Sequence, residues 1–415
     1  MGVFSVRVLR SIRMLEYMEL VALFFLQGAA LGMWFVPLSN VLDSHGLHAI
    51  RPYAFAASAL AAFVSPLVFG AMADRHASPV KVLRGLSLAT AIAMALASSA
   101  IQFGASPWIV LLLIQLHALC SAPTWSISSS IVFARLSDAG KEFGPIRAMA
   151  TLGWMAGCWT VSLLNADAST LSCYGGAVMW LVVCGFTFFL PTVDVPKSAA
   201  NLTWHERLGL DALTLLKNRD HRVVFITTAL FSIPLAAFYP YAPPHLRELG
   251  LQHTSAWMTL GQVTEIIAMF SLAALLKMRL KWIFACGLSF GVARFAFSAL
   301  DSKTGLLIGI LLHGCSYTMV LITAQIYLDQ RVENAWRTRA QALLSLMNGG
   351  VGNLLGYIGT GFWFAACTRS SGTQWSLFWN GLAVAAAVVL IYFLVAYHGR
   401  GSQPATAKKT SAPTA

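Results

Sequence analysis

Charged residues are scarce in this sequence, and acidic residues are fewer than basic ones. Only 11% of its 415 residues are Asp, Glu, Lys or Arg, against about 25% in soluble domains. This shortage excludes an ordinary water-soluble enzyme, and the high apolar content excludes intrinsic disorder. The seven cysteines form no CxxC pair and no metal-ligand spacing. Walker, HExxH and GxSxG motifs are also missing. We therefore expect neither an enzyme nor a metalloprotein.

Long apolar segments dominate the sequence instead. Hydrophobic residues make up 57% of the chain, in continuous runs that far exceed the roughly 10-residue alternating segments of a membrane β-barrel. Helices of about 20 residues span a bilayer, so the pattern predicts an all-α integral membrane protein with twelve transmembrane helices in two six-helix bundles. The predicted spans lie near residues 17–38, 50–73, 83–102, 106–134, 147–165, 172–191, 222–243, 254–276, 280–300, 304–328, 339–366 and 375–397.

The polar stretches between the apolar runs predict the domain organisation. An N-terminal six-helix bundle is expected over residues 1–191 and a C-terminal one over 222–398. A cytoplasmic linker over 192–221 joins them, and a low-complexity tail over 399–415 is expected to be disordered.

The net charge of +12 reflects membrane orientation and requires no nucleic-acid partner. If the N-terminus is cytoplasmic, 22 of the 28 Lys and Arg residues fall in the arm, loops, linker and tail on the cytoplasmic side, and four fall on the opposite side. This asymmetry follows the positive-inside rule. It predicts two cytoplasmic termini, an even number of spans and a lipid bilayer as the surroundings.

Two six-helix halves joined by a long linker are the architecture of the major facilitator superfamily, in which parallel halves rock around a site at the middle of the membrane. The segment GAMADR, which runs from Gly70 to Arg75 at the end of the second span, resembles the Gly-x-x-Ala-Asp-Arg loop of that superfamily. The resemblance implies a gating role for Gly70, Asp74 and Arg75.

One carboxylate lies well inside an apolar span. Glu265 sits near the middle of the eighth span, and Gln262 lies one turn earlier on the same helix face. An ionisable residue at this depth is expensive in lipid and indicates function. Because burial disfavours its charged form, Glu265 is a candidate for proton binding and release near neutral pH. The alternative is a carboxyl held in a permanent hydrogen-bond network.

Basic and aromatic residues of other spans are further candidates. Arg147 opens the fifth span, and Thr151 and Trp154 follow on the same helix face. Arg147 is expected either to bind a polar substrate or Glu265, or to extend to the cytoplasmic interface. Arg294, about 13 residues into the ninth span, is expected to extend to the far interface, and the alternative is a functional role as a charge inside a span. Tyr239 lies beside a proline-interrupted end of the seventh span, as an interfacial anchor or a stacking platform.

The tenth span carries the remaining polar candidates. His313, Tyr317 and Thr318 occupy one broad face. Histidine titrates near physiological pH, so His313 is a second proton candidate. The alternative is a hydrogen-bonded structural histidine.

Several stretches, in order along most of the chain, together resemble the nucleoside:proton symporter family, the bacterial nucleoside permeases of the major facilitator superfamily. The matching stretches are APTWSISSSIVFARLSDAG, FGPIRAMATLGW, LGLDALTLLKNR, GQVTEI, ARFAFSAL, HGCSYT and RTRAQALLSLMNGGVGNLLG.

The resemblance implies a role for particular residues. The uridine-site arginine of the family corresponds to Arg147, with Thr151 and Trp154 on its face. The family's glutamine and glutamate correspond to Gln262 and Glu265. Its two aromatic positions on the tenth span correspond to His313 and Tyr317.

This chain departs from the family at three positions. Thr318 stands where an acidic residue is expected, which leaves Glu265 as the main proton-coupling candidate. Ala236 and Tyr239 stand at polar amide positions, which leaves the nucleoside specificity open.

Taken together, the sequence predicts a monomeric, proton-coupled nucleoside importer of the bacterial inner membrane that works by alternating access. A small molecule is its expected partner, and the proton replaces any cofactor. Substrate binding is assigned to Arg147, Thr151, Trp154, Tyr239, Gln262, His313, Tyr317 and Thr318. Two alternatives stay open: a symporter of sugars or another small polar metabolite, and a membrane sensor or enzyme that transports nothing.

Overall fold

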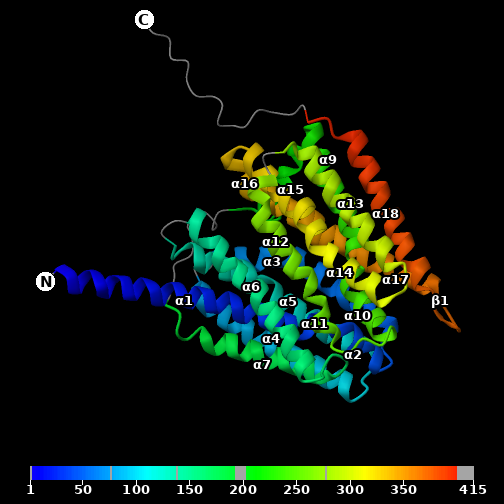
Figure 1. Cartoon of the computed structure of the whole chain (residues 1–415). Helices are drawn as coiled ribbons and strands as arrows, with labels where there is room; N and C mark the ends of the chain where they lie inside the picture. Colours follow the sequence, from blue (N-terminus) through cyan, green and yellow to red (C-terminus); the bar gives the residue numbers. More distant parts are fainter. Residues whose placement is uncertain (1, 75–76, 137–138, 192–201, 276–277, 400–415) are drawn as a thin grey trace, which may run out of the picture. The chain divides into compact units, whose positions relative to one another are not determined.

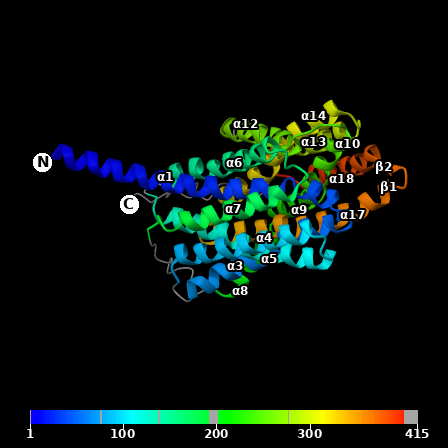
Figure 2. The same cartoon turned by 90° about the horizontal axis from the view of Figure 1, so that it is seen from below.

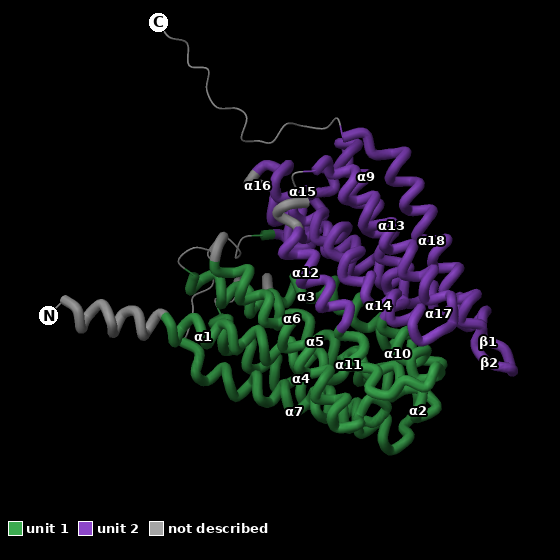
Figure 3. Tube along the Cα trace, in the orientation of Figure 1, with its two compact units in different colours: residues 1–202, 239–259 green, residues 203–238, 260–415 purple. Residues whose placement is uncertain are grey.

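The computed structural model describes residues 2–74, 77–136, 139–191, 202–275 and 278–399, and almost all of them are helical (Figures 1 and 2). The chain divides into two compact units, shown in different colours in Figure 3. Unit 1 comprises residues 1–202 and 239–259, and unit 2 comprises 203–238 and 260–415.

Unit 1 is built from the first part of the chain together with one later segment, residues 239–259. Its elements are α1 (Gly2–Phe35), α2 (Leu38–Ser44), η1 (His48–Ile50), α3 (Arg51–Asp74), α4 (Pro79–Gln102), α5 (Pro107–Phe133), α6 (Ala139–Leu163), α7 (Thr170–Phe186), nearly all of α10 (Phe238–Glu248), and α11 (Thr254–Met258).

Unit 2 contains the other helices and a two-stranded antiparallel hairpin. Its elements are α8 (Trp204–Arg207), η3 (Leu210–Lys217), α9 (Arg219–Leu235), α12 (Leu260–Leu275), α13 (Leu280–Ser298), α14 (Lys303–Tyr317), η4 (Thr318–Ile322), α15 (Thr323–Arg331), α16 (Asn334–Ser345), η5 (Leu346–Gly352), α17 (Asn353–Cys367), β1 (Thr368–Arg369), β2 (Gly372–Thr373) and α18 (Trp375–Ala396).

The all-helical prediction is confirmed, and helices cover every predicted span. Eight helical segments of the described residues are long and apolar enough to cross a membrane: Met14–Ser44, His48–Val68, Pro79–Gln102, Pro107–Phe133, Arg219–Glu248, Leu280–Ser298, Lys303–Arg331 and Trp375–Ala396. Helix α7 is a shorter apolar helix. Helices α6, α11 with α12, and α16 to α17 cover the remaining predicted spans. The count of twelve crossings stays a prediction.

The two units divide the chain differently from the predicted bundles. Residues 239–259, expected in the C-terminal bundle, belong to unit 1. Residues 203–221, expected in the linker, belong to unit 2, where they form α8, η3 and the start of α9. Linker residues 192–201 and tail residues 400–415 lie outside the described residues.

Local sequence signals set many helix starts. Pro79 and Pro107 lie in the first turns of α4 and α5, where a missing backbone N–H costs little. Asn218 caps α9 by accepting from the backbone nitrogens of Asp220 and His221. The seventh span is interrupted, but not at the prolines expected to break it. Helix α9 ends at Leu235 after Pro234, a new helix begins at Phe238, and Pro243 and Pro244 lie inside that second helix.

Glycines bring α1 and α6 into backbone contact in unit 1. A Cβ at Gly28 or Gly32 would overlap the backbone of α6, and a Cβ at Gly153 or Gly157 would overlap the backbone of α1. Small residues at four-residue spacing permit this approach between apolar helices. The contact fixes the α6 face that carries Trp154.

Candidate functional site

In unit 1, two predicted site residues, Trp154 and Tyr239, form an aromatic cluster with Phe35. The indole of Trp154, which is 7% exposed on α6, lies edge-on to the Tyr239 ring with 6.0 Å between centroids. Tyr239 also meets Phe35 of α1 edge-on at 5.2 Å. The Tyr239 ring is thus in edge-on contact with two aromatic side chains, a preferred geometry for aromatic pairs.

Arg147 lies on the same helix, about two turns before Trp154. Its guanidinium carbon is 5.2 Å from the ring centroid of Trp125 on α5, and its side chain is exposed. Thr151 is half-buried between these two positions. Helix α6 begins at Ala139 and continues through Pro145, so Arg147 lies inside the helix and does not open it.

In unit 2, α12 and α14 approach backbone to backbone. A Cβ at Gly314 would overlap the backbone nitrogen of Glu265, and a Cβ at Gly261 would lie 3.4 Å from Cβ of His313. Thr264 Oγ1 donates to the Leu311 carbonyl oxygen across the same interface at 2.5 Å. This packing places α12, which carries Gln262 and Glu265, beside α14, which carries His313 and Tyr317.

The remaining candidates of unit 2 differ in burial. Gln262 is 6% exposed, and Glu265 and Tyr317 are half-buried. Thr318 is fully buried, and its hydroxyl donates to the Glu265 carbonyl oxygen at 3.5 Å. Thr318 also begins the π-helix η4. Such widened turns are frequent at functional sites.

Arg294 does not extend to an interface, so that expectation is wrong. Its side chain is 2% exposed on α13, and its Nη1 donates to Nδ1 of His313 at 2.5 Å. The His313 ring stacks on Phe238 with 4.1 Å between centroids. The guanidinium carbon of Arg294 lies 4.5 Å from the Phe238 ring centroid. An imidazole acceptor and an aromatic face therefore contribute to accommodating the charge inside the unit.

The predicted gating residues are only partly described. Gly70 and Asp74 belong to α3, and Arg75 lies outside the described residues. Gating by this segment stays a prediction.

Four neighbours of the candidate residues were not predicted as such: Trp125 and Phe35 in unit 1, and Arg294 and Phe238 in unit 2. Arg294 carried a usable signal, because a charge well inside a span indicates function by default. The three aromatic residues carried none, since apolar spans are rich in such side chains and only the packing identifies their neighbours.

A cavity of about 460 Å³ lies elsewhere in unit 1, lined by Asn40, Asn165, Asp167, Ala168, Arg247, Gly250, Leu251, Gln252, His253 and Thr254. One oxygen of Asp167, Oδ1, accepts from Ser162 Oγ at 3.1 Å, from Thr254 Oγ1 at 3.3 Å and from the backbone nitrogen of Ser255 at 2.6 Å. These bonds help to explain why residues 239–259 belong to unit 1. Among the described residues, no group of His, Cys, Asp or Glu is arranged to hold a metal ion.

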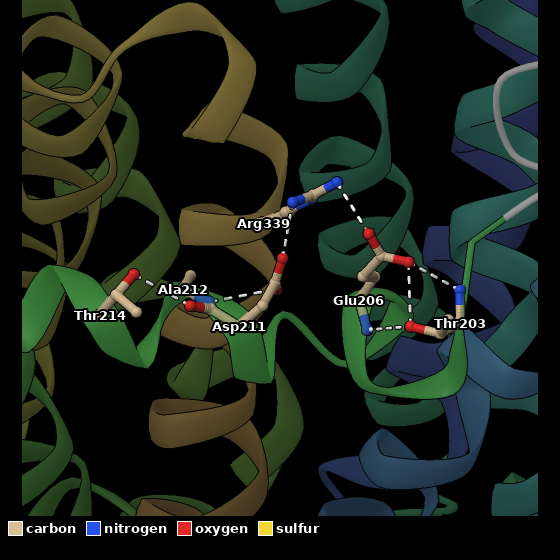
Figure 4. Close-up of polar contacts among 6 residues, drawn as sticks. All are labelled: Thr203, Glu206, Asp211, Ala212, Thr214 and Arg339. Carbon is tan, nitrogen blue, oxygen red and sulfur yellow. Dashed lines mark hydrogen bonds and ion pairs between the residues drawn. The ribbon is translucent and has the colours of Figure 1, made fainter.

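A charged cluster fixes α8 and η3 to α16 in unit 2 (Figure 4). Arg339 donates from Nη2 to Glu206 at 3.0 Å and from Nη1 to Asp211 at 2.7 Å. Hydrogen bonds from the backbone and side chain of Thr203, with the charge of Arg339, lower the pKa of Glu206. Gly209 allows the close approach, because it has a φ of +71° and a Cβ there would lie 2.5 Å from the Arg339 carbonyl oxygen.

Comparison with known proteins adds evidence along nearly the whole chain. The sequence profile of the nucleoside H⁺ symporter family matches residues 14–401. YegT of Escherichia coli (strain K12), a candidate nucleoside transporter, is 34% identical over 386 residues, which cover 88% of this chain and 89% of YegT. The xanthosine permease of the same organism is 25% identical over 90% of this chain and 95% of its own length.

Comparison with solved structures also finds a nucleoside transporter. The crystal structure of the nucleoside transporter NupG matches with a TM-score of 0.82 and 25% identity, over 92% of this chain and 98% of NupG.

Proposed function

We propose that this chain, which belongs to the nucleoside H⁺ symporter family, carries a nucleoside inward together with protons by alternating access. The observation that carries the proposal is the family match over residues 14–401. As a member of this family, the protein is a multi-pass membrane transporter of the major facilitator superfamily fold and not an enzyme. The bacterial inner membrane, cytoplasmic termini and a monomeric state belong to the proposal.

Nucleoside recognition draws on a planar base and a polar ribose. In unit 1, the Trp154 and Tyr239 rings offer faces and edges for a base. Arg147 and Thr151 supply hydrogen-bond donors on the same helix. The names of the relatives, as nucleoside or xanthosine transporters, favour this class of substrate.

In unit 2, Gln262, His313, Tyr317 and Thr318 supply polar groups, and Glu265 carries the proton. Glu265 is half-buried, and its helix packs closely on the helix of His313 where Gly314 meets the backbone of Glu265. In this proposal, Glu265 takes up a proton in one access state and releases it in the other. No further cofactor is required. Gly70, Asp74 and Arg75 would restrain the movement between the two access states.

The proposal is tested by uptake of radiolabelled uridine into cells that express the protein, with and without a protonophore. The expected result is uptake above that of cells with an empty vector, which collapses when the protonophore is added. Competition by a panel of unlabelled nucleosides and sugars identifies the substrate class. Uptake that sugars inhibit and nucleosides do not would overturn the nucleoside assignment, and uptake insensitive to the protonophore would overturn proton coupling.

A further inference from the structure

The contact between Arg294 and His313 is the most closely defined polar contact inside unit 2. Nη1 of Arg294 lies 2.5 Å from Nδ1 of His313, and the two residues are 2% and 4% exposed. Their helices are held together next to the contact, because a Cβ at Gly309 on α14 would lie 2.7 Å from the Arg294 carbonyl oxygen. The pair is therefore set by the packing of α13 on α14.

The chemistry of guanidinium and imidazole determines which ring nitrogen of His313 carries the hydrogen. A guanidinium remains protonated in proteins and only donates hydrogen bonds. Nδ1 of His313 must therefore accept, and it accepts with its lone pair. A neutral imidazole carries one N–H, so the proton lies on Nε2. Protonation of Nδ1 would break the bond to Arg294 and place a second cation beside it.

Phe238 holds both members of the pair in place. Its ring stacks on the imidazole with an interplanar angle of 21°, and the Arg294 guanidinium lies over the same ring. A cation over an aromatic face is attracted to it, which partly offsets the cost of burying the charge. The imidazole plane is consequently fixed, and so is the direction of its Nε2–H.

We propose that Arg294 is a positioning residue that holds His313 as the neutral Nε2–H tautomer. His313 then donates this hydrogen to an acceptor atom of the nucleoside and takes no part in proton coupling. This inference rests on the proposed function, and it removes one of the two proton candidates that the sequence offers.

Other titratable groups of unit 2 also lie near His313. Helix α12 contributes Glu265, whose backbone nitrogen lies against Gly314. Helix α14 itself contributes Tyr317, 5.9 Å from His313 between ring centroids. The thiols are Cys286 on α13 and Cys315 on α14. Because the guanidinium of Arg294 remains protonated and can only donate, His313 is expected to stay neutral from about pH 5 to about pH 8, the range in which histidine ordinarily titrates.

The direct test uses ¹⁵N NMR of the full-length protein with ¹⁵N-labelled histidine, in nanodiscs and without substrate. His313 is assigned by the signals lost in His313→Gln. The expected result is a neutral ring with its proton on Nε2 across that pH range. In Arg294→Gln, the ring is expected to become cationic as the pH falls. A wild-type His313 that is protonated on Nδ1, or that titrates, would overturn the proposal.

His117 is a matched internal control. It is fully buried in unit 1, and its Nδ1 lies 3.2 Å from the Thr90 carbonyl oxygen. A carbonyl only accepts, so His117 is expected to carry its proton on Nδ1. The same spectrum must therefore show opposite tautomers for two buried histidines, and a global change of the fold would alter both.

Transport kinetics give a second readout. Arg294→Gln is expected to raise the KM for nucleoside roughly tenfold and to add a pH dependence beyond that of the wild type, whereas Arg294→Lys restores part of the loss. The added pH dependence is expected to vanish in the Arg294→Gln/His313→Gln double variant. A KM whose pH dependence in Arg294→Gln equals that of the wild type would contradict the positioning role. The NMR test needs no substrate, so it reports on the tautomer of His313 alone. The uptake assay reports on nucleoside transport, and the two claims can therefore fail separately.

Discussion

Gly314 of α14 packs so closely on Glu265 of α12 that a Cβ at position 314 would overlap the backbone nitrogen of residue 265. The contact joins the helix of the proton-coupling candidate to the helix that carries His313 and Tyr317. The spacing between these side chains is therefore set by a residue that has no side chain of its own. Any change at Gly314 must move one helix relative to the other.

Gly314→Ala is expected to lower the free energy of unfolding by about 1–3 kcal/mol, because the added methyl group has no space. Thermal unfolding of the purified protein measures this change. Gly359→Ala is the matched control, since a Cβ at Gly359 meets no atom within 4 Å. Equal unfolding temperatures for the two variants would contradict the described packing.

Glu265→Gln is expected to abolish concentrative uptake, because an amide cannot carry a proton. Exchange of internal for external nucleoside should persist, since it moves no net proton. Counterflow and net uptake, measured on the same vesicles, separate the two activities. Glu248→Gln, at an exposed carboxylate, is the control and should retain both. Uphill accumulation by Glu265→Gln would rule out Glu265 as the proton carrier.

The sequence predicted the helices because apolar runs, prolines and capping residues act locally. Asn218 caps α9 and Pro107 begins α5 without any distant partner. The shared face of His313 and Tyr317 likewise follows from helical spacing, and their rings lie 5.9 Å apart.

Features that depend on packing between distant segments were not predictable. The placement of residues 239–259 in unit 1 involves Asp167, which lies 88 positions before its partner Ser255. Arg294 was expected to extend to an interface because hydropathy places a residue along a span without identifying the acceptor beside it. The π-helix at Thr318 also has no signature in a single sequence.

Tyr239→Ala is expected to raise the KM for nucleoside roughly tenfold, because the platform against Trp154 and Phe35 loses its ring. Tyr239→Phe keeps the ring and should transport almost as the wild type does. Initial uptake rates over a range of substrate concentrations measure both variants. If Tyr239→Phe is impaired as strongly as Tyr239→Ala, the hydroxyl and not the ring is the recognition group.

Glu206 is expected to make the attachment of α8 and η3 to α16 depend on pH. Because folding lowers its pKa from the ordinary value of 4.5, the ionised carboxylate stabilises the attachment above that value. The contribution is lost as the pH falls through the lowered pKa. Amide hydrogen exchange of residues 204–217 is expected to be slower in the wild type than in Glu206→Gln at neutral pH. The difference should shrink below about pH 4.5, and a constant difference would contradict the assignment.

Uridine accumulation in proteoliposomes with an imposed pH gradient tests the central claim most directly, because the purified protein and the proton gradient are the only components. We predict accumulation above the external concentration when the outside is acidic, none without a gradient, and alkalinisation of the medium when uridine is added. Accumulation that is the same with and without the gradient, or proton movement that does not respond to nucleosides, would contradict the account.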